Sequence, residues 1–412
     1  MHMLGFARRK KAAIIHIFCH FIATTNAYVG SNRSDRQIDT RMSEMLLTPH
    51  TPIDDAISGG DLVGRAARLK QVPDDKAMLR AVAELTRDLA APNPRIFWSD
   101  FLLSALVGYA GLAVAIMSGT LWVQCVAALV SILGLYRAGG FIHEVTHVKH
   151  SALPGFRFGF NAVIGVPLLV PSYMYEGIHN LHHARTRYGT DQDPEYLPLA
   201  LMKPWTLPVF IIVSLLAPIA LLFRNAVLAP LSLFIPALRK VVVERYSGLA
   251  INPAFRRRPA EGDAHRNWIV QETAASIWSI ALLTGVFTGF IPLPSFLIFL
   301  AIVASVAVLN QVRTLVAHLW ENEGEAMTVT AQFLDSVNVP PPGLAAEIWA
   351  PVGLRYHALH HLMPSMPYHD LPEAHRRLAR ELGNGSTYEG ANHPGMLVLV
   401  GRIAKSTMGK WA

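Results

Sequence analysis

The sequence predicts an all-α integral membrane protein with four to six transmembrane helices, arranged in hairpins, and a cytoplasmic helical cap that carries clusters of histidine. The first observation is composition, since the 412 residues are 52% hydrophobic and only 16% charged, against about 25% charged residues in average soluble domains. The second is a set of apolar runs long enough to cross a bilayer. The third is that ten of the 18 histidines lie in four places just outside those runs.

The same composition excludes several classes of protein. With only two cysteines, Cys19 and Cys125, the chain cannot supply a four-thiolate zinc site, an iron–sulfur cluster or the framework of a disulfide-stapled secreted domain. The net charge of +7 is modest, and the lysines and arginines lie mostly beside apolar segments. This pattern indicates charge at a membrane surface rather than a nucleic-acid footprint.

Residues 1–41 allow two interpretations. The basic run 8–11 and the apolar stretch 12–23 have the outline of a signal sequence, but the apolar stretch is too short to span a bilayer. The alternative is a translated upstream extension, with Met42 as the working start.

Residues 42–94 are predicted to form a cytoplasmic lead-in to the membrane domain. A helix over 74–90 would place four apolar residues on one face, namely Met78, Val82, Leu85 and Leu89. Two aspartates favour the start of this helix, and two prolines favour its end. We expect it to lie on the membrane or on the body of the protein.

Three apolar blocks follow, and each is interpreted as a hairpin of two segments. They are 97–118 with 121–136, 206–223 with 226–238, and 273–289 with 295–312. Prolines interrupt the second block and its second half is short, so this half spans, tilts or re-enters the membrane. The apolar stretch 161–171 is too short to cross and is expected at the interface.

Orientation follows from the basic residues, which accumulate on the cytoplasmic side of membrane proteins. The lysines and arginines of this region fall between the hairpins, and the proposed outer turns hold only Arg224. Each hairpin therefore returns the chain to the cytoplasm, and the histidine clusters lie on that side. We divide this part of the chain into a membrane domain over 95–385 and a C-terminal tail over 386–412.

The spacing of the histidines is typical of metal ligands. The pattern HxxxH begins at His143, and HxxHH occurs twice, beginning at His179 and at His357. On a helix, residues i, i+3 and i+4 share one face, so each motif offers two or three imidazoles in one direction. His318, which we expect the last transmembrane helix to present, brings the candidate ligands to nine. Nine is too many for one tetrahedral zinc and fits two metal ions.

Longer stretches around these motifs resemble a known family. The membrane fatty acid desaturase and hydroxylase superfamily has three histidine boxes, to which HEVTH, HNLHHARTRYGTDQDPE and HALHHLMPSMPYHDLPEAHRRL are similar. The resemblance covers roughly residues 95–385 and implies a non-haem di-iron centre. Its implied ligands are His143, His147, His179, His182, His183, His318, His357, His360 and His361.

By this resemblance the protein is an O2-dependent oxidoreductase, and the first expectation is a fatty acid desaturase that introduces a double bond into an acyl chain. A hydroxylase of a lipid, an alkane or a carotenoid is the alternative. The expected partners are a lipid acyl substrate in the membrane and an external electron donor of the ferredoxin, rubredoxin or cytochrome type. The metal pair is expected to carry the chemistry, so no side chain is assigned a catalytic role.

Two other classes of protein compete with this interpretation. HEVTH also matches HExxH, the zinc-protease motif in which Glu144 would be the general base. A protease would use two histidines and leave seven unexplained. A metal transporter would place its ligands near the middle of the membrane, whereas these histidines lie at the ends of apolar runs.

Residues around the motifs are weaker candidates. Four acidic residues could orient ligand imidazoles, although each also suits a surface or capping role: Glu144, Asp191, Asp193 and Glu195. Two polar residues approach His318 along the chain, namely Asn310 and Arg313. Three histidines are expected to lie outside the site, namely His150, His369 and His375.

Overall fold

The computed structural model describes residues 72–343 and 345–411, so the expectations for residues 1–41 lie outside the described residues. The described residues form helices and turns, with isolated β-bridges and no strand. Five helices of this described part of the chain are long and apolar enough to cross a membrane: α4 (Pro94–Met117), α5 (Leu121–His147), the helix Thr206–Ser232, α11 (Gly262–Phe287) and α12 (Leu293–Leu315). The predicted all-α membrane fold is confirmed.

Helices α4 and α5 form the first predicted hairpin, and glycines let them approach closely. A Cβ added to Gly134 would lie 2.6 Å from the backbone nitrogen of Gly108, and one added to Gly111 would lie 2.8 Å from the carbonyl oxygen of Ala127. Small residues at such contacts favour helix packing inside a membrane. The hairpin therefore holds the end of α5, and the HxxxH motif on it, in a fixed place.

The second apolar block supplies one candidate span rather than two. Its helices are α8 (Thr206–Phe223), which continues through a π-helical turn (Arg224–Leu228) into α9 (Ala229–Ser232), and α10 (Pro236–Tyr246). The prediction that Arg224 lies in an outer turn is wrong. Arg224 begins the π-helical turn inside this span and is only 3% exposed. Its guanidinium binds the Glu272 carboxylate of α11 and the Ser247 hydroxyl. Burying an arginine requires such partners, and apolar patterning alone does not reveal them.

Helices α11 and α12 form the third predicted hairpin, and the loop after α12 corrects the prediction for His318. His318 lies three residues beyond the end of α12 rather than on the helix, and it pairs with Ser336 in an antiparallel β-bridge. Trp320 has a φ of 61°, which is strained for a bulky residue. The indole N–H of Trp320 donates to the Leu315 carbonyl at 2.7 Å. Packing and this bond hold the loop in its conformation.

Short helices lie before, between and after the spans. They are α6 (Phe156–Phe160), the π-helical turn Asn161–Gly165, α7 (His179–His182) and the 3-10 turns Arg87–Leu89, Ser172–Met174, Leu199–Leu201 and Glu389–Ala391. The apolar stretch 161–171 is not among the candidate spans, in agreement with its short length. Its interfacial position stays a prediction.

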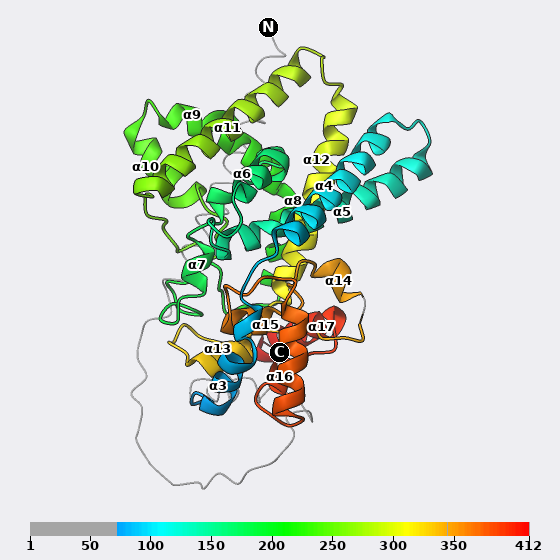
Figure 1. Cartoon of the computed structure of the whole chain (residues 1–412). Coiled ribbons are helices and arrows are strands. Elements are labelled where there is room, and N and C mark those ends of the chain that lie inside the picture. The colour runs from blue at the N-terminus through cyan, green and yellow to red at the C-terminus, as the bar shows by residue number, and fades with distance from the viewer. Residues whose placement is uncertain (1–71, 344, 412) are drawn as a thin grey trace.

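The cap gathers at one end of the molecule, below the α4–α5 hairpin and α12 (Figure 1). Its helices are α3 (Lys76–Leu85), α13 (Val329–Asp335), α14 (Ala346–Trp349), α15 (His357–Leu362), α16 (Leu371–Leu382) and α17 (Met396–Trp411). The helix predicted over 74–90 is α3, which the Asp75 side chain caps. Met78 and Val82 share an apolar cluster with Leu359 and Leu378. This helix therefore lies on the body of the protein, one of the two places predicted.

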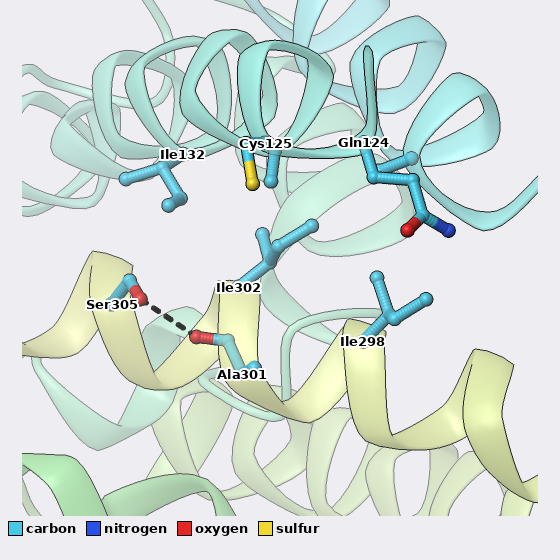
Figure 2. Close-up of a pocket in the computed structure, with 9 residues that line it drawn as sticks. Gln124, Cys125, Ile132, Ile298, Ala301, Ile302 and Ser305 are labelled. Atoms are coloured by element: carbon cyan, nitrogen blue, oxygen red, sulfur yellow. Dashed lines mark hydrogen bonds between the residues drawn. The ribbon is translucent and has the colours of Figure 1, made fainter. Parts of the chain in front are cut away.

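Helices α5 and α12 enclose an apolar groove of about 230 Å³ (Figure 2). Its wall includes Cys125 and Ile132 from α5 and Ile298 and Ile302 from α12. The Ser305 hydroxyl at its edge donates to a backbone carbonyl of its own helix at 2.8 Å. The groove is therefore suited to hydrocarbon rather than to a polar group.

Candidate metal centre

The structure brings all nine predicted histidines together in two groups. The first group holds His143, His147, His179, His183 and His360, and the second holds His182, His318, His357 and His361. Within each group, one nitrogen from every ring lies within 4.8 Å of the others. The groups adjoin each other, since the ring centroids of His183 and His361 are 4.2 Å apart. The arrangement can hold two metal ions side by side.

Each HxxHH motif contributes to both groups. His179 and His183 lie in the first group while His182 lies in the second, and the third motif divides in the opposite sense. The reason is helical geometry, because position i+4 lies about 40° to one side of position i and position i+3 about 60° to the other. A single turn of helix, such as α7, therefore supplies ligands to two neighbouring ions.

The ring nitrogens face one another at distances that suit metal ligands. In the first group, the Nε2 atom of His183 lies 3.0 Å from that of His179 and 3.1 Å from that of His360. In the second, the Nε2 atom of His318 lies 3.2 Å from that of His182 and 3.1 Å from that of His357. Neighbouring ligands of one ion with bonds of about 2.1 Å have similar spacing.

The hydrogen bonds behind the second motif fix which nitrogen carries the proton. The Nδ1 atom of His182 lies 2.9 Å from an Asp193 carboxylate oxygen, and that of His179 lies 3.0 Å from Glu195. An imidazole that donates from Nδ1 to a carboxylate has a lone pair on Nε2. The Nε2 lone pairs thus converge, and a bound cation is the arrangement that makes this favourable. The residues present therefore fit a metal pair.

Burial also favours the neutral imidazole in six of the seven candidate ligands that lie outside the membrane spans. It lowers the pKa of six histidines well below the ordinary value, namely His179, His183, His318, His357, His360 and His361. His182 differs, because burial lowers its pKa but the Asp193 carboxylate more than offsets this effect and raises it. Neutral imidazole is the form that binds a metal.

A network of hydrogen bonds that the sequence did not reveal surrounds the His318 ring. The Tyr188 hydroxyl lies 2.8 Å from Nδ1 of His318 and donates to the Asp335 carboxylate at 2.8 Å. Tyr196 donates to the same carboxylate oxygen at 2.9 Å, and the Ser336 hydroxyl lies 3.2 Å from the same ring nitrogen. The two tyrosines lie far in the sequence from His318, Asp335 and Ser336, and none of these partners follows a metal-ligand spacing, so only the fold brings them together.

The weaker candidates divide clearly. Asp193 and Glu195 contact ligand imidazoles, whereas Asp191 is exposed and only its backbone carbonyl is bound, by Asn252. Glu144 also contacts a candidate ligand, because its carboxylate lies 3.4 Å from Nδ1 of His143 while it accepts a hydrogen bond from the Tyr368 backbone N–H at 3.1 Å.

The other histidines near the motifs stay outside both groups, as predicted. His150 contacts the Arg157 guanidinium, His369 accepts from the Asn93 backbone N–H, and His375 contacts the Tyr388 hydroxyl.

Comparison with known proteins places this geometry in a family. Residues 120–390 match the sequence model named "Fatty acid desaturase". The chain belongs to the fatty acid desaturase family. It is also 46% identical over 335 residues to the "Ceramide hydroxylase" of Caulobacter vibrioides (strain NA1000 / CB15N), across 81% of this chain and 95% of that relative. No solved structure matches the chain.

As a member of the fatty acid desaturase family, this multi-pass membrane protein is an O2-dependent oxidoreductase, as predicted. The zinc-protease alternative is not supported, because His143 and His147 join three further histidines instead of forming a separate site. The transporter alternative is not supported either, since the histidines gather where the spans meet the cap.

Proposed function

We propose that the chain is a di-iron, O2-dependent hydroxylase of a ceramide or another N-acyl lipid. The observation that carries the proposal is the pair of adjoining histidine groups, in a chain 46% identical to a protein named as a ceramide hydroxylase. Desaturation of an acyl chain, the first expectation from the sequence, becomes the second candidate. The name of the matching family model supports it, while the similarity to a ceramide hydroxylase over 81% of the chain favours hydroxylation.

We propose iron as the metal and all nine histidines as its ligands. Imidazole suits iron, zinc and copper, and the family's chemistry with O2 requires a redox-active metal. When bound, an iron pair would supply the oxidant that removes hydrogen from an unactivated carbon, which no side chain can supply.

The chain's own residues orient the ligands and shield the centre. Asp193 and Glu195 hold the Nδ1 protons of His182 and His179, so that Nε2 of each ring faces the metal site. Six of the nine histidines are buried, which keeps water away from the reacting groups. The partial exposure of His147, His183 and His361 leaves one side at which O2 and substrate can approach.

The groove between α5 and α12 supports a substrate with a hydrocarbon chain. Ile132 in its wall lies 11 residues before His143, on the same face of α5 and about 16 Å along the helix axis. A Cβ added to Gly139, which lies on that face between them, would meet no atom within 4 Å. The distance of about 16 Å between Ile132 and His143 along the helix is close to the hydrocarbon thickness of one leaflet, about 15 Å. We propose that a lipid tail extends from the centre toward the groove.

We also propose that the centre faces the cytoplasm and receives electrons from an external carrier of the ferredoxin, rubredoxin or cytochrome type. The distribution of basic residues supports the orientation. The lack of a flavin motif and of cluster cysteines in the sequence supports the need for a carrier.

Lipid analysis under 18O2 tests the proposal. A host that makes ceramide but lacks this enzyme is supplied with wild-type protein or with His361→Ala. We expect hydroxylated ceramide carrying one 18O atom with the wild type, and no such product with the variant. Unsaturated chains without added oxygen would select desaturation, and unchanged lipids in a cell containing iron-loaded protein would contradict both candidates.

A further inference from the structure

The exposed apolar side chains of the cap are confined to two of its helices. Within the described residues of α3 and α13–α17, the large apolar side chains that are exposed are Ile348 on α14 and Leu397, Val398 and Met408 on α17. Leu397 is 80% exposed, whereas α16 exposes none of its leucines. Apolar surface that gathers in one place marks a contact with a protein or a membrane. We refer to these four side chains as the apolar face of the cap.

Helices α14 and α17 meet in one apolar cluster beside the end of α12. Trp349 of α14 and Met396 and Leu399 of α17 belong to this cluster, together with Val316, which follows α12. The exposed residues of both helices directly precede or follow these cluster residues in the sequence, except Met408. Met408 lies 11 residues after Leu397, or about three turns, so it shares a side of α17 with Leu397. Figure 1 shows both helices at the cap end of α12. The apolar face therefore adjoins the membrane-spanning helices.

The depth of α14 follows from its contacts with α5. The Tyr136 hydroxyl donates to the Trp349 carbonyl at 2.6 Å, and a Cβ added to Gly140 would lie 3.5 Å from Val352. Trp122 is exposed in the first turn of α5 and marks the opposite boundary of the membrane. Tyr136 lies 14 residues, or about 21 Å, beyond that boundary, within a hydrocarbon core of about 30 Å. The end of α14 therefore lies at the depth of acyl chains.

The depth of α17 follows from its contacts at the start of α8. The Ser406 hydroxyl donates to the Ala200 carbonyl at 2.6 Å, and Ile403 shares an apolar cluster with Phe210 of α8. Trp205, directly before α8, is 52% exposed, as is typical of tryptophan at the interface between membrane and water. Helix α17 therefore lies at the level at which α8 enters the membrane.

We propose that the apolar face of the cap is a membrane contact, which holds the cap in the leaflet at its own end of the spans, between headgroups and acyl chains. Lipid is the partner because the face continues the exposed apolar surface of the spans at the same depth. Helices in the plane of a membrane bury their apolar side about 5 to 10 Å into this boundary. Lys405 is exposed on α17, and its apolar stem lets the ammonium reach the headgroups.

Site-specific fluorescence of the full-length protein, held as one chain per lipid nanodisc, tests the inference. In a background of Cys19→Ser and Cys125→Ser, an environment-sensitive dye is attached to Leu397→Cys or to Ile348→Cys. One quencher is a lipid that carries bromine on its acyl chains near the headgroup, and the other is iodide in the water. We expect a blue-shifted emission, quenching by the brominated lipid and protection from iodide at both positions. The result does not depend on the proposed function, because the measurement needs no turnover.

Two exposed positions elsewhere provide matched controls for this measurement. Leu106→Cys in the span α4, where the native side chain is 66% exposed, represents contact with lipid. Ala379→Cys on α16, also exposed, represents contact with water. The inference is overturned if the dyes at Leu397→Cys and Ile348→Cys behave like the dye at Ala379→Cys. Protection from both quenchers overturns it as well, because protein rather than lipid would then cover the face.

Charged substitutions test whether the apolar side chains hold α17 at the membrane. Leu397→Glu combined with Val398→Glu should lower the quenching of a dye at Met408→Cys by the brominated lipid and raise its quenching by iodide. The reason is that an ionised carboxylate is costly among acyl chains. Ala379→Glu, at the exposed position on α16, should leave both values unchanged. Unchanged quenching in the double variant would contradict the contact.

Discussion

At the scale of single residues, each imidazole of the centre has to present one defined nitrogen. The Asp193 carboxylate fixes which nitrogen the His182 ring presents. It also accepts hydrogen bonds from the backbone N–H groups of Gly189 and Glu195, both at 2.8 Å. It is fully buried, so its position is fixed by bonds rather than by water. The carboxylate therefore acts on the metal site through the orientation of one ring.

Asp193→Asn should weaken iron binding about 10- to 100-fold, the usual effect of removing a partner behind a metal ligand. The amide offers a neutral oxygen in place of the carboxylate, so His182 loses the bond that fixes its tautomer. Chelator titration of the purified protein, with iron measured by mass spectrometry, gives the affinity. Asp191→Asn is the matched control, because that side chain is exposed. Equal iron retention by the two variants would contradict the orienting role.

The sequence predicts which histidines come together but not how they divide between the two groups. The spacings HxxxH and HxxHH identify eight of the nine, because i, i+3 and i+4 share a helix face. The division into five and four follows from small rotations between those positions and from the relative placement of α5, α7 and α15. The hydrogen bond between Tyr188 and Asp335 could not be predicted from the sequence, because 147 residues separate the two partners.

At the scale of elements, the cap helix α16 carries a buried titratable group. His375 on α16 is buried, and its Nδ1 atom lies 2.9 Å from the Tyr388 hydroxyl. Burial lowers the pKa of His375 from its ordinary value of 6.5 to about 4. Because the unfolded chain binds this proton more readily, the stability due to neutral His375 is fully present above pH 6.5 and is lost as the pH falls toward 4.

His375→Gln should remove this part of the pH dependence. The loss between pH 6.5 and 4 corresponds to about 3 kcal/mol in the wild type, whereas glutamine does not titrate and still offers a partner to Tyr388. Hydrogen exchange of α16 amides, corrected for intrinsic rates, measures the local opening energy at each pH. His265→Gln, at an exposed position, should keep the wild-type profile. The same profile in His375→Gln would disprove the assignment.

Elements whose form depends on residues far away in the sequence could not be predicted from the sequence. The amphipathic pattern of α3 and the apolar lengths of α4, α5, α11 and α12 were sufficient to identify those helices. The second block was predicted as two segments, because nothing near Arg224 in the sequence indicates its partner Glu272 on α11. The loop after α12 depends on the bridge between His318 and Ser336, which is likewise a tertiary contact.

At the scale of the whole molecule, the proposed orientation places the α4–α5 turn outside the cell. In a background of Cys19→Ser and Cys125→Ser, Gly119→Cys puts a thiol in that turn, where an added Cβ meets no atom within 4 Å. A membrane-impermeant maleimide should label it in intact cells. Arg185→Cys, exposed beside the second motif, should react only after permeabilisation. The reverse pattern would place the metal centre on the outer face.

The central claim is that two adjoining histidine groups hold a pair of irons. Metal analysis of purified, catalytically active protein tests it most directly, with His360→Ala and His182→Ala as variants of the first and second group. We expect about two irons per chain in the wild type and a loss of iron in each variant, while both variants still insert into the membrane. One zinc per active chain, or full iron content in both variants, would contradict the claim.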